Sequence, residues 1–518
     1  MPPLTGIAAF AQSTPDKVAL IDGQRSVTFS QLDRRTNQLA RALRHRGVGP
    51  GDRIASALRN SIEWFEVAGA ASRLGVTIVP VSWRSQHDEV AYMVEDSGAK
   101  LVLAEPDATE IMAGLPAVFV GDSYEAMLQG QDPAPLDEPG EPALVPFRYY
   151  TSGTTGRPKA IEREIPSDPG ALAALRAMMA PTVTDVELGP DGRRPLGRGQ
   201  TEGLEAPDEV HLLVGPAYHT APGAFASRAL QQFGQTVVIM RHFDARECLA
   251  LIEANRVSWS HMVPINFVRI LALPEEVRRA FDLSSVRRIL HAAAPCPVQV
   301  KRAIMEVFPP GSIYEYYGAT EGLVTLCPAD EWLQRPGTVG RAAPGVTVRI
   351  YDDDGNELPP GEVGTVYFTT MARVSYAGAP EKTAAAWRGD YFTVGDMGYL
   401  DEDGYLFLTD RKIDMIISGG ANVYPAEVES VLFTHPAVGD VAVFGIPDPE
   451  WGERVHAVIE PQGPVTEEEV IAYCRARLAH YKCPTSVEIV DALPRDPNGK
   501  IRKRLLRDRF WQASDRKI

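Results

Sequence analysis

The sequence predicts a layered α/β fold: a large N-terminal domain with a small, mobile α+β C-terminal domain. Helix-like and strand-like segments alternate along most of the chain, as they do in βα units that build sheets with helices on both faces. After Asp410 a shorter set of such segments follows, of the size of an independent small domain. We place the boundary at Arg411, which gives residues 1–411 to the large domain and 412–518 to the small one.

The large domain begins with a predicted helix over 31–46, and Gly47 after it predicts a helix C-cap and turn. The Gly-rich stretch 47–51 is no dinucleotide fingerprint, because it follows a helix instead of a strand. The other predicted helices are 61–75, 87–96, 245–255 and 298–307, and the predicted strands are 76–81, 101–103, 236–240, 257–263, 286–291 and 312–317. The Gly- and Arg-rich stretch between 166 and 207 predicts an exposed excursion or a mobile loop.

The small domain is predicted to hold two helices and three strands. The helices are 426–434 and 466–480, and the strands are 440–445, 454–460 and 486–490. The two domains meet near Arg411 to Asp414, and a swivel between them is expected within Lys412 to Asp414.

Composition excludes several classes of protein. The 52 basic and 68 acidic residues give a formal net charge of -16, which argues against a general nucleic-acid binder. The first residues carry no Lys or Arg before their apolar stretch, and no apolar run approaches the roughly 20 residues of a membrane span. The five cysteines are scattered without a CxxC pair, which indicates reduced thiols. We expect a cytoplasmic enzyme.

The sharpest local signal is the loop between Tyr150 and Lys159. Three hydroxyl side chains and two glycines offer donors to phosphate oxygens, glycines let the backbone come close, and Lys159 adds a cation. It is not the common P-loop, because Arg157 and Pro158 separate Gly156 from Lys159. The sequence therefore predicts a different kind of phosphate-binding loop.

With this loop, five further motifs occur in order: Tyr317-Gly-Ala-Thr-Glu321, Tyr391 to Asp396, Asp410-Arg411, Ser418 to Glu429, and Pro494 to Lys500. Together they resemble the superfamily of adenylate-forming enzymes, which includes acyl-CoA synthetases, luciferases and the adenylation domains of peptide synthetases. The resemblance covers essentially the whole chain. It implies a ligase that activates a carboxylic acid with ATP and Mg²⁺ as an acyl-adenylate, and then transfers the acyl group to coenzyme A.

The resemblance also implies roles for residues of these motifs. Thr320 would contact the α-phosphate, Glu321 would hold Mg²⁺, Asp396 would accept hydrogen bonds from the ribose, and Arg411 would reach the ribose or phosphate. Lys500 would lie over the carboxylate and α-phosphate during adenylation. The implied nucleotide-binding set is Thr151, Ser152, Gly153, Thr154, Thr155, Gly156, Lys159, Ala293, Ala294, Pro295, Tyr316, Tyr317, Gly318, Ala319, Thr320, Asp396, Arg411 and Lys500, with Tyr316 stacking on adenine.

Two more segments are assigned by resemblance. The stretch 215–223 is similar to the family's aromatic-His motif, which puts Tyr218, His219, Ala221 and Gly223 at the acyl group and gives His219 a catalytic position. Ser418, Gly419 and Gly420 would leave room for the pantetheine arm of coenzyme A after the small domain swings. The small residues between Ala221 and Ser227 favour a roomy, apolar pocket, and hence a medium- or long-chain or bulky cyclic acid.

Alternatives remain open at this stage. A carrier protein's thiol is the alternative acceptor, because the same active site would serve a stand-alone adenylation enzyme. An inactive relative that acts as a binding or regulatory protein is the second alternative, which the complete set of motif residues disfavours. A homodimer is also left open. The sequence identifies neither the acid nor the pathway.

Overall fold

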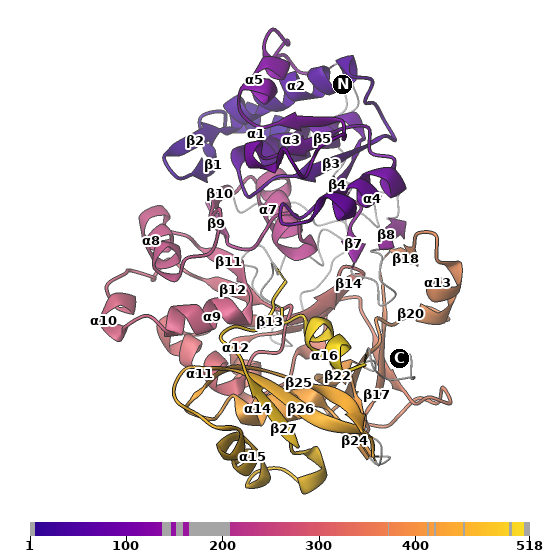
Figure 1. Ribbon diagram of the computed structural model, residues 1–518. Coiled ribbons are helices and arrows are strands. Elements are labelled where there is room, and N and C mark those ends of the chain that lie inside the picture. The colour runs from indigo at the N-terminus through magenta and orange to yellow at the C-terminus, as the bar shows by residue number, and fades with distance from the viewer. Residues whose placement is uncertain are drawn as a thin grey trace.

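The computed structural model describes residues 6–136, 147–151, 159–164, 208–370, 372–411, 414–418, 421–448, 451–496 and 500–511. Of Thr151, Glu164, Asp410 and Arg411 it describes the backbone alone. The predicted excursion between 166 and 207 lies outside these residues. In Figure 1 the indigo N-terminal elements lie at the top and the orange-to-yellow C-terminal domain at the bottom, with the pink central strands between them.

A parallel run of strands forms the middle of the large sheet. Its hydrogen-bonded order is β13-β12-β11-β9-β10-β1, and each neighbouring pair is parallel. The strands are β1 (Val18–Asp22), β9 (Val210–Leu213), β10 (Thr236–Ile239), β11 (Trp259–Met262), β12 (Arg288–His291) and β13 (Ile313–Ala319). Parallel strands need crossover connections, which the intervening helices supply.

Helices cover both faces of this run. The covering helices are α1 (Gly6–Ser13), α2 (Phe29–His45), α3 (Ile62–Leu74) and α7 (Thr220–Phe233) on one face, and α8 (Ala245–Asn255), α9 (Pro264–Leu271) and α11 (Val298–Val307) on the other. Successive strand residues enter opposite cores: Leu213 packs in the first and Leu212 in the second. Strands buried on both faces are usually continuous apolar runs, and Val237 to Ile239 of β10 fits that pattern, whereas β11 and β12 also bury His261 and Arg288.

Antiparallel strands extend the same sheet at both ends. At one edge β2 (Arg25–Thr28) pairs with β1. Beyond β13 lie β14 (Gly322–Cys327), β15 (Gly340–Ala342), β16 (Val348–Tyr351), β17 (Gly364–Thr369), β19 (Trp387–Arg388), β20 (Tyr391–Phe392), β21 (Asp396–Leu400) and β22 (Tyr405–Arg411). The short helices near them are α10 (Glu275–Arg278), α12 (Ala329–Gln334) and α13 (Pro380–Ala386).

Two smaller sheets complete the large domain. One has the order β4-β3-β5-β6 and is parallel, and the other has the order β18-β8-β7. Their strands are β3 (Arg53–Ala57), β4 (Thr77–Pro80), β5 (Val102–Ala104), β6 (Ala117–Phe119), β7 (Tyr150–Thr151), β8 (Lys159–Glu164) and β18 (Arg373–Tyr376). Beside them lie α4 (His87–Ser97), η1 (Pro106–Ala108) and α5 (Asp122–Leu128).

The C-terminal domain has its own sheet and cores. The sheet order is β24-β23-β26-β25, with β27 on β26, and two apolar clusters lie against it. Its elements are β23 (Ile416–Ser418), β24 (Ala421–Val423), α14 (Pro425–Leu432), β25 (Val438–Asp448), β26 (Gly452–Pro461), α15 (Glu467–Arg475), η2 (His480–Lys482), β27 (Ser486–Ile489) and α16 (Lys503–Trp511). The predicted boundary at Arg411 falls between the last strand of one sheet and the first strand of the other, and it stays a prediction.

The predicted α/β class with a large and a small domain is confirmed, and all the predicted helices and strands occur. Helices 245–255 and 298–307 have their predicted bounds. The helix predicted over 466–480 is too long, because α15 ends at Arg475. The chain then turns through η2, which carries Cys483 into the domain core at 3% exposure. Among the described helices, none is both long and apolar enough to cross a bilayer.

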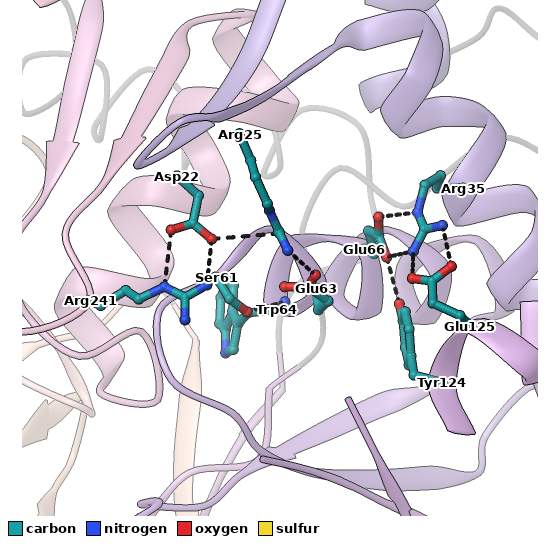
Figure 2. A network of polar contacts seen from close by, with 10 residues as sticks. All are labelled: Asp22, Arg25, Arg35, Ser61, Glu63, Trp64, Glu66, Tyr124, Glu125 and Arg241. Atoms are coloured by element: carbon teal, nitrogen blue, oxygen red, sulfur yellow. Dashed lines mark hydrogen bonds and ion pairs between the residues drawn. The ribbon is translucent and has the colours of Figure 1, made fainter. Parts of the chain in front are cut away.

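A buried carboxylate joins three helices of the N-terminal region (Figure 2). Glu66 on α3 is 1% exposed, and it accepts hydrogen bonds from Arg35 Nε at 2.5 Å and from the Tyr124 hydroxyl at 2.7 Å. Arg35 on α2 also binds Glu125 on α5 at 2.7 and 2.9 Å. Burial raises the pKa of Glu66, and the Arg35 guanidinium opposes that rise.

Replacing Arg35 should therefore destabilise the fold and do so in a pH-dependent way. In Arg35→Met the buried Glu66 loses its cation, which should lower the free energy of unfolding by about 3 kcal/mol at pH 8. The folded-state pKa of Glu66 should rise further above its unfolded value, so the deficit should shrink as the pH falls from 8 to 5. Denaturant unfolding at both pH values measures this. Arg34→Met, at the exposed neighbouring position, should change stability by less than about 0.5 kcal/mol.

Candidate active site

The predicted motifs converge at the carboxyl edge of the parallel strands. Residues 215–219 follow β9, residues 292–297 follow β12, and Thr320 and Glu321 follow β13. Because β9, β11, β12 and β13 are parallel neighbours, the ends of these strands meet at one edge of the sheet. In open α/β sheets this edge is where ligands bind.

The predicted phosphate loop connects two paired strands. Thr151 at the end of β7 pairs with Lys159 at the start of β8, so the loop leaves and re-enters the hairpin at adjacent positions. Tyr150 donates a hydrogen bond to Asp96 Oδ2 at 2.5 Å, which ties the hairpin to α4. The predicted residues Ser152, Gly153, Thr154, Thr155 and Gly156 lie outside the described residues, as does the side chain of Thr151.

Glu321 is a buried carboxylate with cations around it. It is 8% exposed, and its Oε1 accepts a hydrogen bond from the Tyr376 hydroxyl at 3.0 Å. The ammonium of Lys382 lies over the Tyr376 ring at 4.1 Å from its centroid. Burial lowers the pKa of Lys382, nearby Lys159 lowers it further, and Glu321 raises it. Such a carboxylate, with phosphate oxygens beside it, fits the preference of Mg²⁺ for oxygen ligands.

Thr320 lies beside the start of α7. Its hydroxyl is 3.0 Å from the hydroxyl of Thr220, the first residue of that helix. The preceding residue, His219, is the N-cap of α7. The residue predicted at the α-phosphate is therefore adjacent to the residues predicted at the acyl carboxylate.

His219 is part-buried, and its surroundings disfavour the charged imidazolium. Burial lowers its pKa to about 3, and its Nε2 has no hydrogen-bond partner among the described residues. The Tyr218 ring lies 4.5 Å from it, centroid to centroid, and burial raises the pKa of Tyr218 to about 12. His219 can thus accept or donate one hydrogen bond to a ligand, but it supplies no positive charge near neutral pH.

The two tyrosines of β13 take different environments. The hydroxyl of Tyr316 is 2.9 Å from His261 Nε2, and its ring meets Phe225 edge-on in the core beneath α7. The hydroxyl of Tyr317 donates to Asp396 Oδ2 at 2.6 Å. Asp396 is paired in register with Arg411 across β21 and β22. Tyr317 therefore lies at the predicted ribose site. Tyr316 makes its contacts in the core, and its stacking on adenine stays a prediction.

The loop after β12 carries an unusual backbone conformation. Ala293 has φ +76° and is one of two non-glycine residues with positive φ in the described chain. Such strain is retained when surroundings enforce it, and it concentrates at ligand sites. The predicted residues Ala294 and Pro295 follow in the same loop, whereas Gly318 and Ala319 end β13.

Gly223 has a packing role in α7. A Cβ at this position would come within 2.1 Å of the Ala217 carbonyl oxygen, and Trp64 lies 3.5 Å away on the same side. The absent side chain thus allows the turn over 215–219 to pack on the helix. Ala221 is part-buried against the main core. The small size of Gly223 is explained without an open cavity.

The loop before α16 faces the large domain. Lys500 donates its backbone N–H to Asp496 Oδ1 at 2.9 Å, and Arg495 pairs with Ile501. The charges of Asp496 and Arg502 act on Tyr218 at the acyl site. In Figure 1 the yellow segment leading into α16 reaches toward β13, whereas β24 lies at the far edge of the small domain. Ser418 ends β23 beside β24, and Gly419, Gly420, Lys412 and Ile413 lie outside the described residues.

Sequence reasoning missed several residues of this region. Tyr376, Lys382, Arg163 and Arg228 belong to no motif that we used, and Thr220 lies inside the stretch 215–223 without having been assigned a role. In sequence, a Lys or Arg within an ordinary strand or helix is normally interpreted as a surface charge. Tyr376 carries no local signal either, because only the pairing of β8 with β18 places it opposite Ile161 and near Glu321.

Comparisons with known proteins agree with this geometry. Residues 7–372 match the family model described as AMP-binding enzyme, and residues 427–500 match the AMP-binding enzyme C-terminal domain. The chain is 34% identical to the fatty acid–[acyl-carrier-protein] ligase ScoC of Streptomyces coeruleorubidus, over 98% of this chain and 96% of the relative. It is also 34% identical to the long-chain-fatty-acid–CoA ligase FadD13 of Mycobacterium tuberculosis, over 93% of each.

A solved structure shares the whole fold. The o-succinylbenzoate CoA synthetase MenE of Bacillus subtilis, in complex with its acyl-adenylate intermediate, is similar with a TM-score of 0.80 and 27% identity. The similarity covers 100% of this chain and 99% of MenE.

The low pKa of His219 leads to a prediction about acid stability. The folded-state pKa is about 3 and the unfolded value is about 6.5, so the unfolded chain binds the proton first. This contribution to stability is present above pH 6.5 and is lost as the pH falls, by about 2 kcal/mol between pH 8 and pH 5. In His219→Gln the pH dependence of the unfolding free energy should be weaker by that amount. Equal pH dependence in both proteins would show that folding does not lower the pKa of His219.

Proposed function

The chain belongs to the AMP-binding enzyme family, and from that premise we propose that it is an ATP-dependent acid–thiol ligase. It converts a carboxylic acid and ATP into an acyl-adenylate and pyrophosphate, and then transfers the acyl group to coenzyme A with release of AMP. The observation that carries the proposal is the convergence of the segments after β9, β12 and β13 at one sheet edge, facing the loop of Lys500.

The first half-reaction brings two anions together, a carboxylate and a triphosphate. Lys159, Lys382 and the phosphate loop offset the phosphate charge, and Thr320 binds the α-phosphate beside Thr220. Glu321 would hold Mg²⁺, which supplies charge neutralisation and orientation of the phosphates when bound. Tyr376 orients the Glu321 carboxylate through its hydroxyl. Asp396, positioned by Tyr317, receives the ribose, with Arg411 beside it.

Lys500 completes the site for adenylation. Its loop faces Tyr218 in this conformation, and an ammonium placed there stabilises the charge that develops between the carboxylate and the α-phosphate. The second half-reaction needs the thiol to approach the acyl carbon. A swing of the small domain about 412–414 would withdraw Lys500 and bring Ser418, Gly419 and Gly420 to the site.

The acceptor is coenzyme A in this proposal, and a carrier protein is the alternative. FadD13 is named a CoA ligase and ScoC a ligase for acyl carrier protein, and each is 34% identical to this chain. The reaction takes place in the cytoplasm, where ATP and coenzyme A are available. An inactive relative is disfavoured by the intact set of Thr320, Glu321, Asp396 and Lys500.

The direct test is ATP-dependent AMP release with coenzyme A across a panel of acids: acetate, fatty, aryl, terpenoid, dicarboxylic and amino acids. Turnover with one class supports the ligase. If pyrophosphate exchange occurs but coenzyme A releases no AMP, a holo-carrier protein is the acceptor. Absence of exchange with every acid would favour the inactive alternative.

Lys500 gives a prediction that separates the half-reactions. Lys500→Ala should lose a transition-state contact worth about 3–4 kcal/mol, so adenylation should slow by about 10²–10³-fold. Thioester formation from preformed acyl-adenylate should change far less, because Lys500 is withdrawn in that step. Single-turnover assays of each step measure this.

The matched control for that experiment is Arg504→Ala. Arg504 is an exposed cation on α16 that pairs with Asp508 at 3.1 Å. It should leave both rates unchanged, and equal losses in both half-reactions for Lys500→Ala would contradict the assigned role.

A further inference from the structure

The α7 wall next to the acyl site carries polar groups that the reaction chemistry does not use. An α-helix has 3.6 residues per turn, so Thr220, Ala224, Ser227 and Gln231 share one stripe, with Arg228 at its edge. Ser227 is 5% exposed and Gln231 6% exposed. Among the described residues, neither Ser227 Oγ nor Gln231 Nε2 has a hydrogen-bond partner.

Tyr149 is a third buried polar group in the same region. It is 5% exposed, and in the described part of the chain its hydroxyl has no hydrogen-bond partner. Its ring packs at 5.4 Å from Phe147, which stacks at 5.9 Å on Trp64, and Trp64 contacts α7 at Gly223. Tyr149 also interacts electrostatically with Arg228 on α7. Buried polar groups are normally hydrogen-bonded, so these three atoms, two on α7 and one on a residue that interacts with it, indicate that a ligand supplies their partners.

Two arginines lie with these groups. Arg163 on β8 and Arg228 on α7 are part-buried, and each interacts electrostatically with the other and with Tyr149. Within the described residues neither forms an ion pair. Burial and, to a smaller extent, the neighbouring Arg163 together lower the pKa of Arg228 to about 10. Two adjacent cations in a partly desolvated place are unfavourable until an anion joins them.

We propose that Arg228 and Arg163, with Tyr149, Ser227 and Gln231, bind a second carboxylate at the far end of the acid substrate. This inference rests on the proposed function and specifies its substrate class: a dicarboxylic acid instead of the apolar acid expected from the small residues of 221–227. Thr220 marks the reacting end, because its hydroxyl contacts Thr320. Arg228 lies eight residues further along α7.

The helix sets the length of the substrate. Eight residues correspond to a rise of about 12 Å, and helical side chains lean toward the N-terminus, so the second carboxylate should lie roughly 6–10 Å from the first. That separation corresponds to a diacid with a spacer of about four to seven carbons. Ala224 lies between the two ends, where a small side chain leaves room for the spacer.

The rival source of the anion is the triphosphate of ATP. Arg163 also interacts with Glu321, at the predicted metal site. Arg228 has no such interaction with Glu321 among the described residues, and it stands two helical turns beyond Thr220. The geometry therefore favours the acid at Arg228, and the experiment must separate the two sources.

The test compares suberate with its monomethyl ester and with octanoate, which match it in length but lack the second charge. Pyrophosphate exchange should be at least about tenfold more efficient with suberate, in kcat/KM, for the wild-type enzyme. Arg228→Met should remove that preference by lowering kcat/KM for suberate about 10- to 100-fold, while the two monoacids change little. Arg228→Lys should retain part of the preference. KM for ATP should stay constant.

A stability measurement complements the kinetics. Because Arg228→Met removes a part-buried cation that forms no ion pair with any described residue, the ligand-free variant should melt at the same or a higher temperature than the wild type. Suberate should raise the melting temperature of the wild type but not of the variant. Arg246→Met, at an exposed position on α8, should behave as wild type in every assay.

Each contrary outcome is decisive. Equal efficiency for suberate and its ester in the wild type overturns the inference, and the proposed ligase stands. A higher KM for ATP with every acid in Arg228→Met assigns the arginine to the triphosphate and also overturns it. Exchange with no acid at all contradicts the proposed function itself.

Discussion

The parallel pairing of β9, β11, β12 and β13 is the constraint on which the site depends. Each strand is buried on both faces, so its register is fixed by two apolar cores at once. Segments separated by about a hundred residues, such as Thr220 and Thr320, therefore meet at one edge. The antiparallel strands from β14 onward continue the same sheet and bring Asp396 to Tyr317. The small domain then needs only one exposed loop, that of Lys500, to face this edge.

Much of the fold follows from the sequence because the strands are doubly buried and the helices are capped. The run 237–240 is apolar without interruption, and α2 carries a capping box at Thr28. The motif residues were likewise identifiable, since their order along the chain is specific. The site residues that could not be predicted from the sequence are those brought in by pairing between distant segments. Tyr376 reaches Glu321 only because β18 pairs with β8, and no local pattern encodes that register.

The polarity of the acyl pocket was also hard to predict from the sequence. Small residues after His219 suggested an apolar space, yet Gly223 is small because the Ala217 carbonyl packs against it. Ser227, Arg228 and Gln231 look like the polar side of an amphipathic helix, and in sequence such residues normally face solvent. In the structure these residues are buried or part-buried, so they are not an ordinary solvent-facing side of the helix. A buried Ser or Gln without a partner is informative about a ligand, whereas the same residue at the surface is not.

The contact between Gly223 and Ala217 has a consequence for altering this enzyme's specificity. It anchors the first turn of α7 to the turn that carries Tyr218 and His219, so any side chain added at Gly223 would displace the reacting end. Ala224, Ser227, Arg228 and Gln231 lie on later turns of α7, beyond this contact. A library that varies these four positions and keeps Gly223 would explore new acids while it preserves the geometry of activation.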